Sequence, residues 1–304
     1  MGIVLQTENL TKIYGTASVV NNVSMRIDQG DIYGFVGRNG AGKTTLMRLI
    51  CGLIKKSSGS FELFGCSDSS PKIEQYRKKL GAIIEAPSVY PNFTAKQNLK
   101  VNSIALGVRD DNIIPRVLSM VNLEGTGNKK VKDFSLGMRQ RLGIAISLLN
   151  NPEFLILDEP VNGLDPQGII EVRDLLKTLN RQYGVTVFIS SHILGELSKL
   201  ATKFGFIENG NFLKEIGADE LENACRKRIV IYIDKTEGLA EALKKIGIKN
   251  YAQISENIVE LYEEPIISSL AFALRDEGIQ LNRVVEKGED LEEYFIGLIG
   301  GLKK

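Results

Sequence analysis

The chain has 304 residues and a formal net charge of +1, and 43% of its residues are hydrophobic and 25% charged. This composition is typical of a globular protein of roughly two domains, and it excludes a chain that is mainly disordered. Short basic clusters are scattered among acidic neighbours, so we expect no nucleic acid as a partner. One histidine and three widely spaced cysteines indicate neither a zinc site nor a disulfide framework.

Membrane signals are absent from the sequence. No apolar run approaches the roughly 20 residues needed to cross a bilayer. The first residues, MGIVLQTENL, show no secretory signal, and Gln6 stands where the myristoylation pattern requires Ser or Thr. We therefore expect a cytoplasmic protein, and any membrane role has to come from a partner.

Strand and turn signals dominate the first 64 residues, and a helix is predicted to begin near Gly42. The predicted strands lie at 4–10, 19–27 and 32–36. From about residue 71 to 128 the signal becomes mostly helical, which indicates an inserted helical subdomain at about 86–150.

Strands and helices then alternate. The predicted elements are helix 137–149, strand 154–158, helix 166–182, strand 185–190, a short helix at about 194–200 and a hairpin at 204–216. Asn209-Gly210 fits the two-residue type I′ turn of that hairpin. This alternation predicts an α/β domain with parallel strands over residues 1–216.

The pattern changes in residues 217–304, which we expect to form a small accessory α+β domain. Its predicted elements are strand 229–233, helix 237–246, strands near 251 and at 258–262, helix 265–276, strand 281–285 and an amphipathic segment from 291.

The most specific motif is GRNGAGKT, in which Gly37, Gly42, Lys43 and Thr44 satisfy the pattern GxxxxGK[ST] between a predicted strand and a predicted helix. Glycines allow the backbone N–H groups of such a loop to converge on a phosphate, the lysine adds a cation, and the hydroxyl can bind Mg²⁺. The alternative is an accidental glycine-rich turn.

A second motif, FLILDEP, is an apolar strand that ends in Asp158 and Glu159. Ligands bind beyond the carboxyl ends of buried parallel strands. Asp158 is placed to hold Mg²⁺ and Glu159 to orient or deprotonate an attacking water. Alone, the same pattern is equally a strand that ends in a solvated acidic turn.

Three further residues each have a structural and a functional interpretation. His192, the only histidine, follows the strand VTVFISS at the same edge, where it can reach a phosphate or be a structural residue. Ser135 begins a helix, either as a simple cap or as a site for an anion brought by another subunit. Asp165 precedes Pro166 and is explained equally well as a helix cap.

Taken in order, these residues resemble the ATP-binding cassette (ABC) ATPases over residues 1 to about 216. The resemblance implies a P-loop NTPase core with an inserted helical subdomain. It identifies Tyr14 as the platform for adenine, 162–165 as the D-loop and His192 as the switch histidine. The residues implied to bind the nucleotide are Tyr14, Gly37, Arg38, Asn39, Gly40, Ala41, Gly42, Lys43, Thr44 and Thr45, with Ser135 and Gly137 of the signature motif.

The same resemblance implies an ATPase that works as a homodimer with ATP between the two copies. Ser135 and Gly137 of one copy then cap the γ-phosphate held by the other. The implied catalytic residues are Glu159, His192 and Lys43, and the implied Mg²⁺ ligands are Thr44, Glu85 and Asp158.

Two departures from the family pattern are present. Leu136 and Met138 replace a glycine and a glutamine of the signature, which restricts the backbone at Leu136. Glu85 replaces the glutamine that usually faces Mg²⁺ and water, and a carboxylate there either binds the metal more strongly or repels the γ-phosphate.

The departures and the C-terminal unit make the chain most similar to the ATPase subunits of exporters for bacitracin-type and lantibiotic peptides. The resemblance implies a separate transmembrane permease, a position on the inner face of the cell membrane, and a groove near residues 85–94 that receives a permease helix. Tyr90 and Phe93 suit that groove, although packing inside the helical subdomain explains them equally well. The alternatives are a soluble ABC ATPase acting on ribosomes or nucleic acid, and an ATP-sensing regulatory module.

Overall fold

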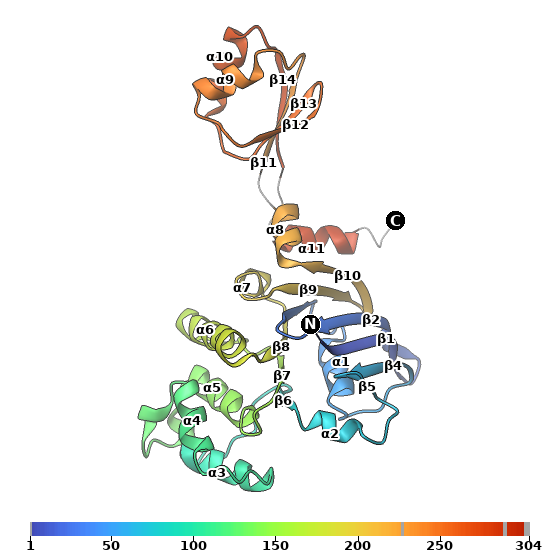
Figure 1. Ribbon diagram of the computed structural model, residues 1–304, viewed down its shortest axis with the longest axis vertical. Coiled ribbons are helices and arrows are strands. Elements are labelled where there is room, and N and C mark those ends of the chain that lie inside the picture. The colour runs from blue at the N-terminus through green and yellow to red at the C-terminus, as the bar shows by residue number, and fades with distance from the viewer. Residues whose placement is uncertain (1, 226–227, 288–290, 301–304) are drawn as a thin grey trace. The chain divides into compact units, whose positions relative to one another are not determined.

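The computed structural model describes residues 2–225, 228–287 and 291–300. The chain forms two compact units, residues 1–218 and 219–304, and each is described by itself (Figure 1).

The first unit is built on one mixed sheet of ten strands in the order β5-β4-β1-β2-β10-β9-β3-β8-β7-β6. One half of this sheet consists of strands β9, β3, β8, β7 and β6. In this half, β3 pairs in parallel with β8 and β9, and β7 pairs in parallel with β8 and β6. Strands β1, β2, β4 and β5 pair in antiparallel fashion. The bounds are β1 Ile3–Tyr14, β2 Ala17–Asp28, β3 Ile32–Val36, β4 Ser58–Leu63, β5 Cys66–Ser67, β6 Leu80–Ile83, β7 Phe154–Asp158, β8 Thr186–Ser191, β9 Lys203–Glu208 and β10 Asn211–Gly217.

Helices cover the central strands. Strands β3, β7 and β8 are buried along their whole length, as expected for parallel strands with both faces covered. Helix α1 (Lys43–Ile50) and helix α6 (Pro166–Tyr183) carry apolar faces. The predicted face of α6 is confirmed, because its buried side chains include Val172, Leu175, Leu176 and Leu179. Each such side chain contributes roughly 1.5–3 kcal/mol through burial.

Short helices complete the first unit. Helices α3 (Ala95–Ala105), α4 (Ile113–Met120) and α5 (Leu136–Ser147) group beside α6 in Figure 1, and α5 contacts α3, α4 and α6. Thr94 and Gln97 form a reciprocal capping box that fixes the start of α3, an arrangement that satisfies two backbone donors. The remaining helices are α2 Ile73–Arg77, η1 Glu124–Thr126, η2 Val131–Asp133 and α7 Leu194–Leu197.

Two sequence-based predictions, the turn at 209–210 and the helical segment 71–128, have different outcomes in the structure. The type I′ turn is confirmed, because Asn209 and Gly210 both have positive φ, 48° and 78°, between paired strands β9 and β10. The segment 71–128 is less helical than predicted, since Leu80–Ile83 form strand β6. That strand exists because it pairs with Phe154–Leu157 of β7, a contact far away in the sequence.

Residues 228–287 of the second unit alternate as β-α-β-β-α-β and form a four-stranded antiparallel sheet in the order β12-β13-β11-β14, a ferredoxin-like arrangement. Ile231, Val259, Leu243 and Leu274 belong to its core. The bounds are α8 Ala218–Cys225, β11 Arg228–Ile233, α9 Leu239–Lys245, β12 Tyr251–Ser255, β13 Ile258–Leu261, α10 Ile267–Asp276, β14 Leu281–Lys287 and α11 Leu291–Gly300. In the described parts of both units, no helix is long and apolar enough to span a bilayer.

Candidate active site

A glycine-rich loop, residues 37–42, joins β3 to α1, and its shape depends on its glycines. Gly40 and Gly42 have φ of 81° and 107°, a region that side chains disfavour. A Cβ atom on Gly37 would lie 2.5 Å from the Ile207 carbonyl oxygen, and one on Gly42 would collide with the Val19 carbonyl oxygen. The loop therefore lies close to neighbouring backbone while its tip, residues 38–40, stays exposed.

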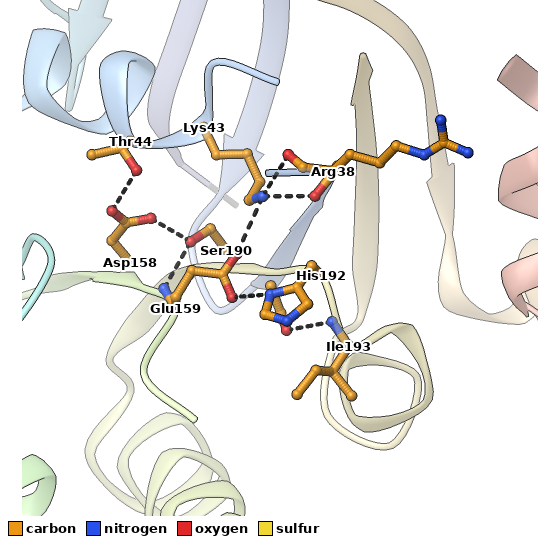
Figure 2. A network of polar contacts seen from close by, with 10 residues as sticks. Arg38, Lys43, Thr44, Asp158, Glu159, Ser190, His192 and Ile193 are labelled. Carbon is orange, nitrogen blue, oxygen red and sulfur yellow. Dashed lines mark hydrogen bonds and ion pairs between the residues drawn. The ribbon is translucent and has the colours of Figure 1, made fainter. Parts of the chain in front are cut away.

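Lys43, the first residue of α1, turns back over this loop (Figure 2). Its Nζ donates to the carbonyl oxygens of Gly37 at 2.6 Å and Arg38 at 3.2 Å. The same ammonium lies 3.2 Å from Oε1 of Glu159, and the Lys43 residue is only 5% exposed. Since a buried charge needs partners, these three oxygens hold the ammonium at the N-terminus of the helix.

Asp158 ends β7 and is 3% exposed. Its Oδ2 accepts from the Thr44 hydroxyl at 2.7 Å and its Oδ1 from the Ser190 hydroxyl at 2.7 Å. The two carboxylate oxygens are thus oriented by α1 on one side and by β8 on the other (Figure 2).

Glu159 follows in a left-handed conformation with φ of 49°. Its backbone N–H donates to Ser190 Oγ at 2.9 Å, and its Oε2 lies 2.7 Å from Nδ1 of His192. The Glu159 carboxylate therefore stands between Lys43 and His192 (Figure 2). His192 is partly open to solvent, with 35% of its side chain exposed.

These residues gather at the carboxyl ends of β3, β7 and β8, the edge where ligands bind in parallel sheets. A helix N-terminus and a lysine together suit an anion. A carboxylate held by hydrogen bonds beside that anion site can act on a water molecule. The sequence analysis placed the end of strand VTVFISS at this edge but missed Ser190, because only the register of β8 against β7 shows that Ser190 lies beside Asp158.

Other expected site residues have different surroundings. Glu85 has φ of 68° and forms an ion pair with Arg48 of α1. No cluster of three or more His, Cys, Asp or Glu that could hold a metal occurs among the described residues. Tyr14 lies at the end of β1 with 47% of its surface exposed, and Nζ of Lys12 is 4.7 Å from its ring centre.

The remaining residues of the loop differ in exposure. Arg38 points away from Lys43 in Figure 2, with its guanidinium 3.8 Å from Glu208. Asn39 and Gly40 are exposed, Ala41 is buried and Thr45 is half-buried. The loop thus combines an open tip with a buried base.

The expected signature residues lie at the N-terminus of α5. Ser135 caps this helix, and its Oγ accepts from the Met138 N–H at 3.2 Å. Asp165 caps α6 in the same way through the Gly168 N–H at 3.2 Å. In the described parts of the chain, Ser135 and Gly137 have their close neighbours in α5 and α6 rather than in the loop around Lys43. Leu136 between them is 42% exposed.

Comparison with known proteins gives consistent matches over the whole chain. A family model described as ABC transporter matches residues 20–162. The chain is 41% identical over 303 residues to the bacitracin transport ATP-binding protein BcrA of Bacillus licheniformis, covering 99% of each chain. It is 46% identical over 219 residues to the lantibiotic transport ATP-binding protein SrtF of Streptococcus pyogenes, covering 72% of this chain and 93% of SrtF.

Solved structures match about 70% of the chain. The chain is similar to a dimeric post-hydrolysis state of the ATP-binding cassette MJ0796 bound to ADP and Pi, with a TM-score of 0.63, 25% identity, and coverage of 70% of this chain and 98% of that one. It is also similar to CbiO1 from Clostridium perfringens, part of the ABC transporter complex cbiONQ, with a TM-score of 0.67, 25% identity, and coverage of 73% and 92%.

Proposed function

Because the chain belongs to the ATP-binding proteins of ABC transporters, we propose that it powers a two-component exporter of peptide antibiotics or other amphipathic compounds. The chain is a nucleotide-binding ATPase with the ABC cassette fold. Its cargo, its membrane partner and the roles of its residues are the proposed part. Relatives along the full length are named for bacitracin transport, and this supports the cargo class over an action on ribosomes or nucleic acid.

The site residues divide the reaction among them. The backbone N–H groups of residues 37–45 and the Lys43 ammonium bind the phosphates of ATP, because these residues form the loop before α1 and its first turn. Glu159 takes the proton of the attacking water, and His192, 2.7 Å away, fixes that carboxylate and faces the γ-phosphate. The observation that carries this assignment is the position of the Glu159 carboxylate between Lys43 and His192.

The same ion pair links binding to catalysis. Oε1 of Glu159 lies 3.2 Å from Nζ of Lys43. A phosphate that attracts the Lys43 ammonium competes with this contact. Glu159 Oε1 then becomes available to the attacking water when ATP is bound.

The oxygen atoms of Thr44 and Asp158, beside Glu159, suit Mg²⁺. The Thr44 hydroxyl and the Asp158 carboxylate lie 2.7 Å apart, and Mg²⁺ is usually bound by one or two such oxygens together with substrate phosphates. When bound, Mg²⁺ would neutralise charge on the phosphates. Glu85 can join these ligands only when its ion pair with Arg48 opens.

A second copy completes the site. Ser135 and Gly137 begin helix α5, whose N-terminal amides suit an anion. In the proposed homodimer, this helix caps the γ-phosphate of the ATP held by the partner copy. The dimeric cassette MJ0796 supports this arrangement. A single copy would then bind ATP without completing the γ-phosphate contacts.

The permease is proposed to dock near residues 85–94. Tyr90 and Phe93 are 51% and 38% exposed, and their ring centres lie 5.2 Å apart. The amide of Asn98 fixes this segment, because it exchanges hydrogen bonds with the backbone of Tyr90 at 2.7 and 3.1 Å. Rigid exposed aromatic pairs are suitable anchors for a partner helix. The chain would then lie on the inner face of the cell membrane.

The C-terminal unit, residues 219–304, is proposed to stabilise the dimer or to regulate it. Removal of this unit is expected to weaken dimerisation or to change transport or ATPase rates. Unchanged values of all three would refute this role.

The test of the proposed function uses tagged Glu159→Gln protein, purified from detergent-solubilised membranes with ATP present. We expect loss of hydrolysis, retained ATP binding, a trapped dimer, and recovery of a polytopic membrane protein. Glu153→Gln is the matched control, because Glu153 directly precedes β7 at its opposite end and pairs with Lys79. Recovery of ribosomes or nucleic acid would contradict the exporter, and retained hydrolysis would contradict the role of Glu159.

A further inference from the structure

Ser190 is buried where the two acidic residues after β7 need support. It lies in β8, is 0% exposed, and pairs in register with Asp158 of the neighbouring strand β7. A serine hydroxyl has one donor and two acceptor positions. Here the donor goes to Asp158 Oδ1 at 2.7 Å, and an acceptor position takes the Glu159 N–H at 2.9 Å (Figure 2).

The contact with Glu159 acts on a strained residue. Glu159 has φ of 49°, a conformation that a non-glycine residue keeps only when its surroundings hold it. The hydrogen bond from the Glu159 N–H to Ser190 holds this peptide. This backbone conformation directs the Glu159 carboxylate toward Lys43 and His192.

The contact with Asp158 acts on the proposed metal ligand. Thr44 and Ser190 each bind one oxygen of this carboxylate at 2.7 Å. Thr44 belongs to the nucleotide-binding loop and its helix, whereas Ser190 belongs to a strand of the buried sheet. The serine therefore gives Asp158 a partner outside the nucleotide-binding loop and its helix.

We propose that Ser190 is a positioning residue, whose single hydroxyl sets the orientation of both Asp158 and Glu159 for Mg²⁺-dependent hydrolysis of ATP. It acts through these two residues and does not itself contact the reacting atoms. The inference rests on the roles proposed above for Asp158 and Glu159.

The test compares Ser190→Ala with Ser190→Thr in the full chain. Ser190→Ala removes both hydrogen bonds, and we expect kcat to fall roughly 10- to 100-fold, because errors in positioning have effects of this size. KM for ATP should change by less than about threefold, since ground-state binding through Lys43 is intact. The Mg²⁺ concentration that gives the half-maximal rate should rise. Ser190→Thr keeps the hydroxyl and should restore most of kcat.

Thr186→Val is the matched control on the same strand. Thr186 is also 0% exposed, and its hydroxyl accepts a hydrogen bond from the Gly30 N–H at 3.0 Å, at the other end of β8. This variant should lose stability without the change in kcat or in Mg²⁺ dependence. Binding of a fluorescent ATP analogue in EDTA and thermal unfolding report on the fold of every variant. If Ser190→Ala does not fold, Ser190→Cys replaces it with the same expectation, because a thiol is a weak donor.

Two results would overturn the inference: a kcat of folded Ser190→Ala close to that of the unchanged chain, or an equal loss in Thr186→Val. Glu159→Gln in the same assay separates this failure from failure of the proposed function. If Glu159→Gln is inactive while Ser190→Ala is fully active, only the role of Ser190 is wrong. If Glu159→Gln hydrolyses ATP, the proposed base itself is wrong.

Discussion

The two units distribute their polar residues in different ways. In the first, β3, β7 and β8 are buried along their whole length, and the one charged residue of these three strands, Asp158, stands at the carboxyl end of β7. In the second, β13 alternates between buried and half-buried residues. Its Glu260 pairs with Arg228 at 3.1 Å, and alternation places both on the sheet face away from α9 and α10.

This difference follows from how each sheet is covered. When helices cover both faces of a sheet, charged side chains are favourable only where strands end. Their partners there are fixed, as with Asp158 between Thr44 and Ser190. The second sheet packs its core on one face and carries the ion pair of Arg228 and Glu260 on the other, where the two side chains are 30% and 15% exposed. In the first unit, the reactive side chains are therefore held together at one edge of the sheet. In the second unit, the apolar core is the main determinant of stability.

The largest expected effect tests the core of the second unit. Leu243→Ala should lower the free energy of unfolding of that unit by about 2–5 kcal/mol, because Leu243 is fully buried in its core. The ATPase rate of this variant shows whether an intact C-terminal unit is needed for the regulation proposed above. Hydrogen exchange followed by peptide, beside an ATPase assay, measures both. Ile254→Ala, at a residue 57% exposed, is the control, and a parallel loss of ATPase activity would show that the units are energetically coupled.

Lys43→Ala in the first unit should weaken nucleotide binding and leave the stability of the second unit unchanged. Loss of the charged hydrogen bonds should weaken ATP binding by about 1.5–3 kcal/mol, roughly 10- to 150-fold. Hydrogen exchange in the second unit should not change. A titration with fluorescent nucleotide measures the affinity, and Lys72→Ala, at an exposed lysine, should bind normally. Unchanged affinity in Lys43→Ala would remove the lysine from the phosphate site.

Two glycines, one in each unit, separate the effect of backbone strain from the effect on nucleotide binding. Gly42→Ala faces both a φ of 107° and a collision with the Val19 carbonyl oxygen, whereas Gly247→Ala has φ of 79° and open space around it. Both should cost about 1 kcal/mol or more in backbone strain. Only Gly42→Ala should also reduce ATP affinity, because the loop must shift. Equal nucleotide binding by the two variants would contradict the proposed dependence of the loop on close backbone approach.

The smallest expected effect concerns Tyr14, which is 47% exposed at the end of β1. If its ring stacks on adenine, Tyr14→Ala should raise KM for ATP by about fivefold, equivalent to about 1 kcal/mol. Tyr14→Phe keeps the ring and should retain the original KM. A KM for Tyr14→Ala equal to that of Tyr14→Phe would exclude stacking. Neither variant should alter unfolding of the second unit.

Much of the site was readable in the sequence because its signals are local. The pattern GRNGAGKT determines a loop that needs glycine at positive φ, and Gly40 and Gly42 have such angles. Asp165 and Pro166 predict the start of α6. Asn209-Gly210 predicts the turn between β9 and β10. In each case, the conformational preference of one or two residues is sufficient.

Local sequence patterns are sufficient to predict the loop, the helix starts and the order of the motifs. Which strands become neighbours depends on the folded chain as a whole. Strand β6 exists by pairing with β7, Ser190 reaches Asp158 through the pairing of β8 with β7, and Glu85 meets Arg48. These contacts join residues 74, 32 and 37 positions apart in the sequence. No local preference encodes them, because they depend on the free energy of assembling the whole sheet and its helices.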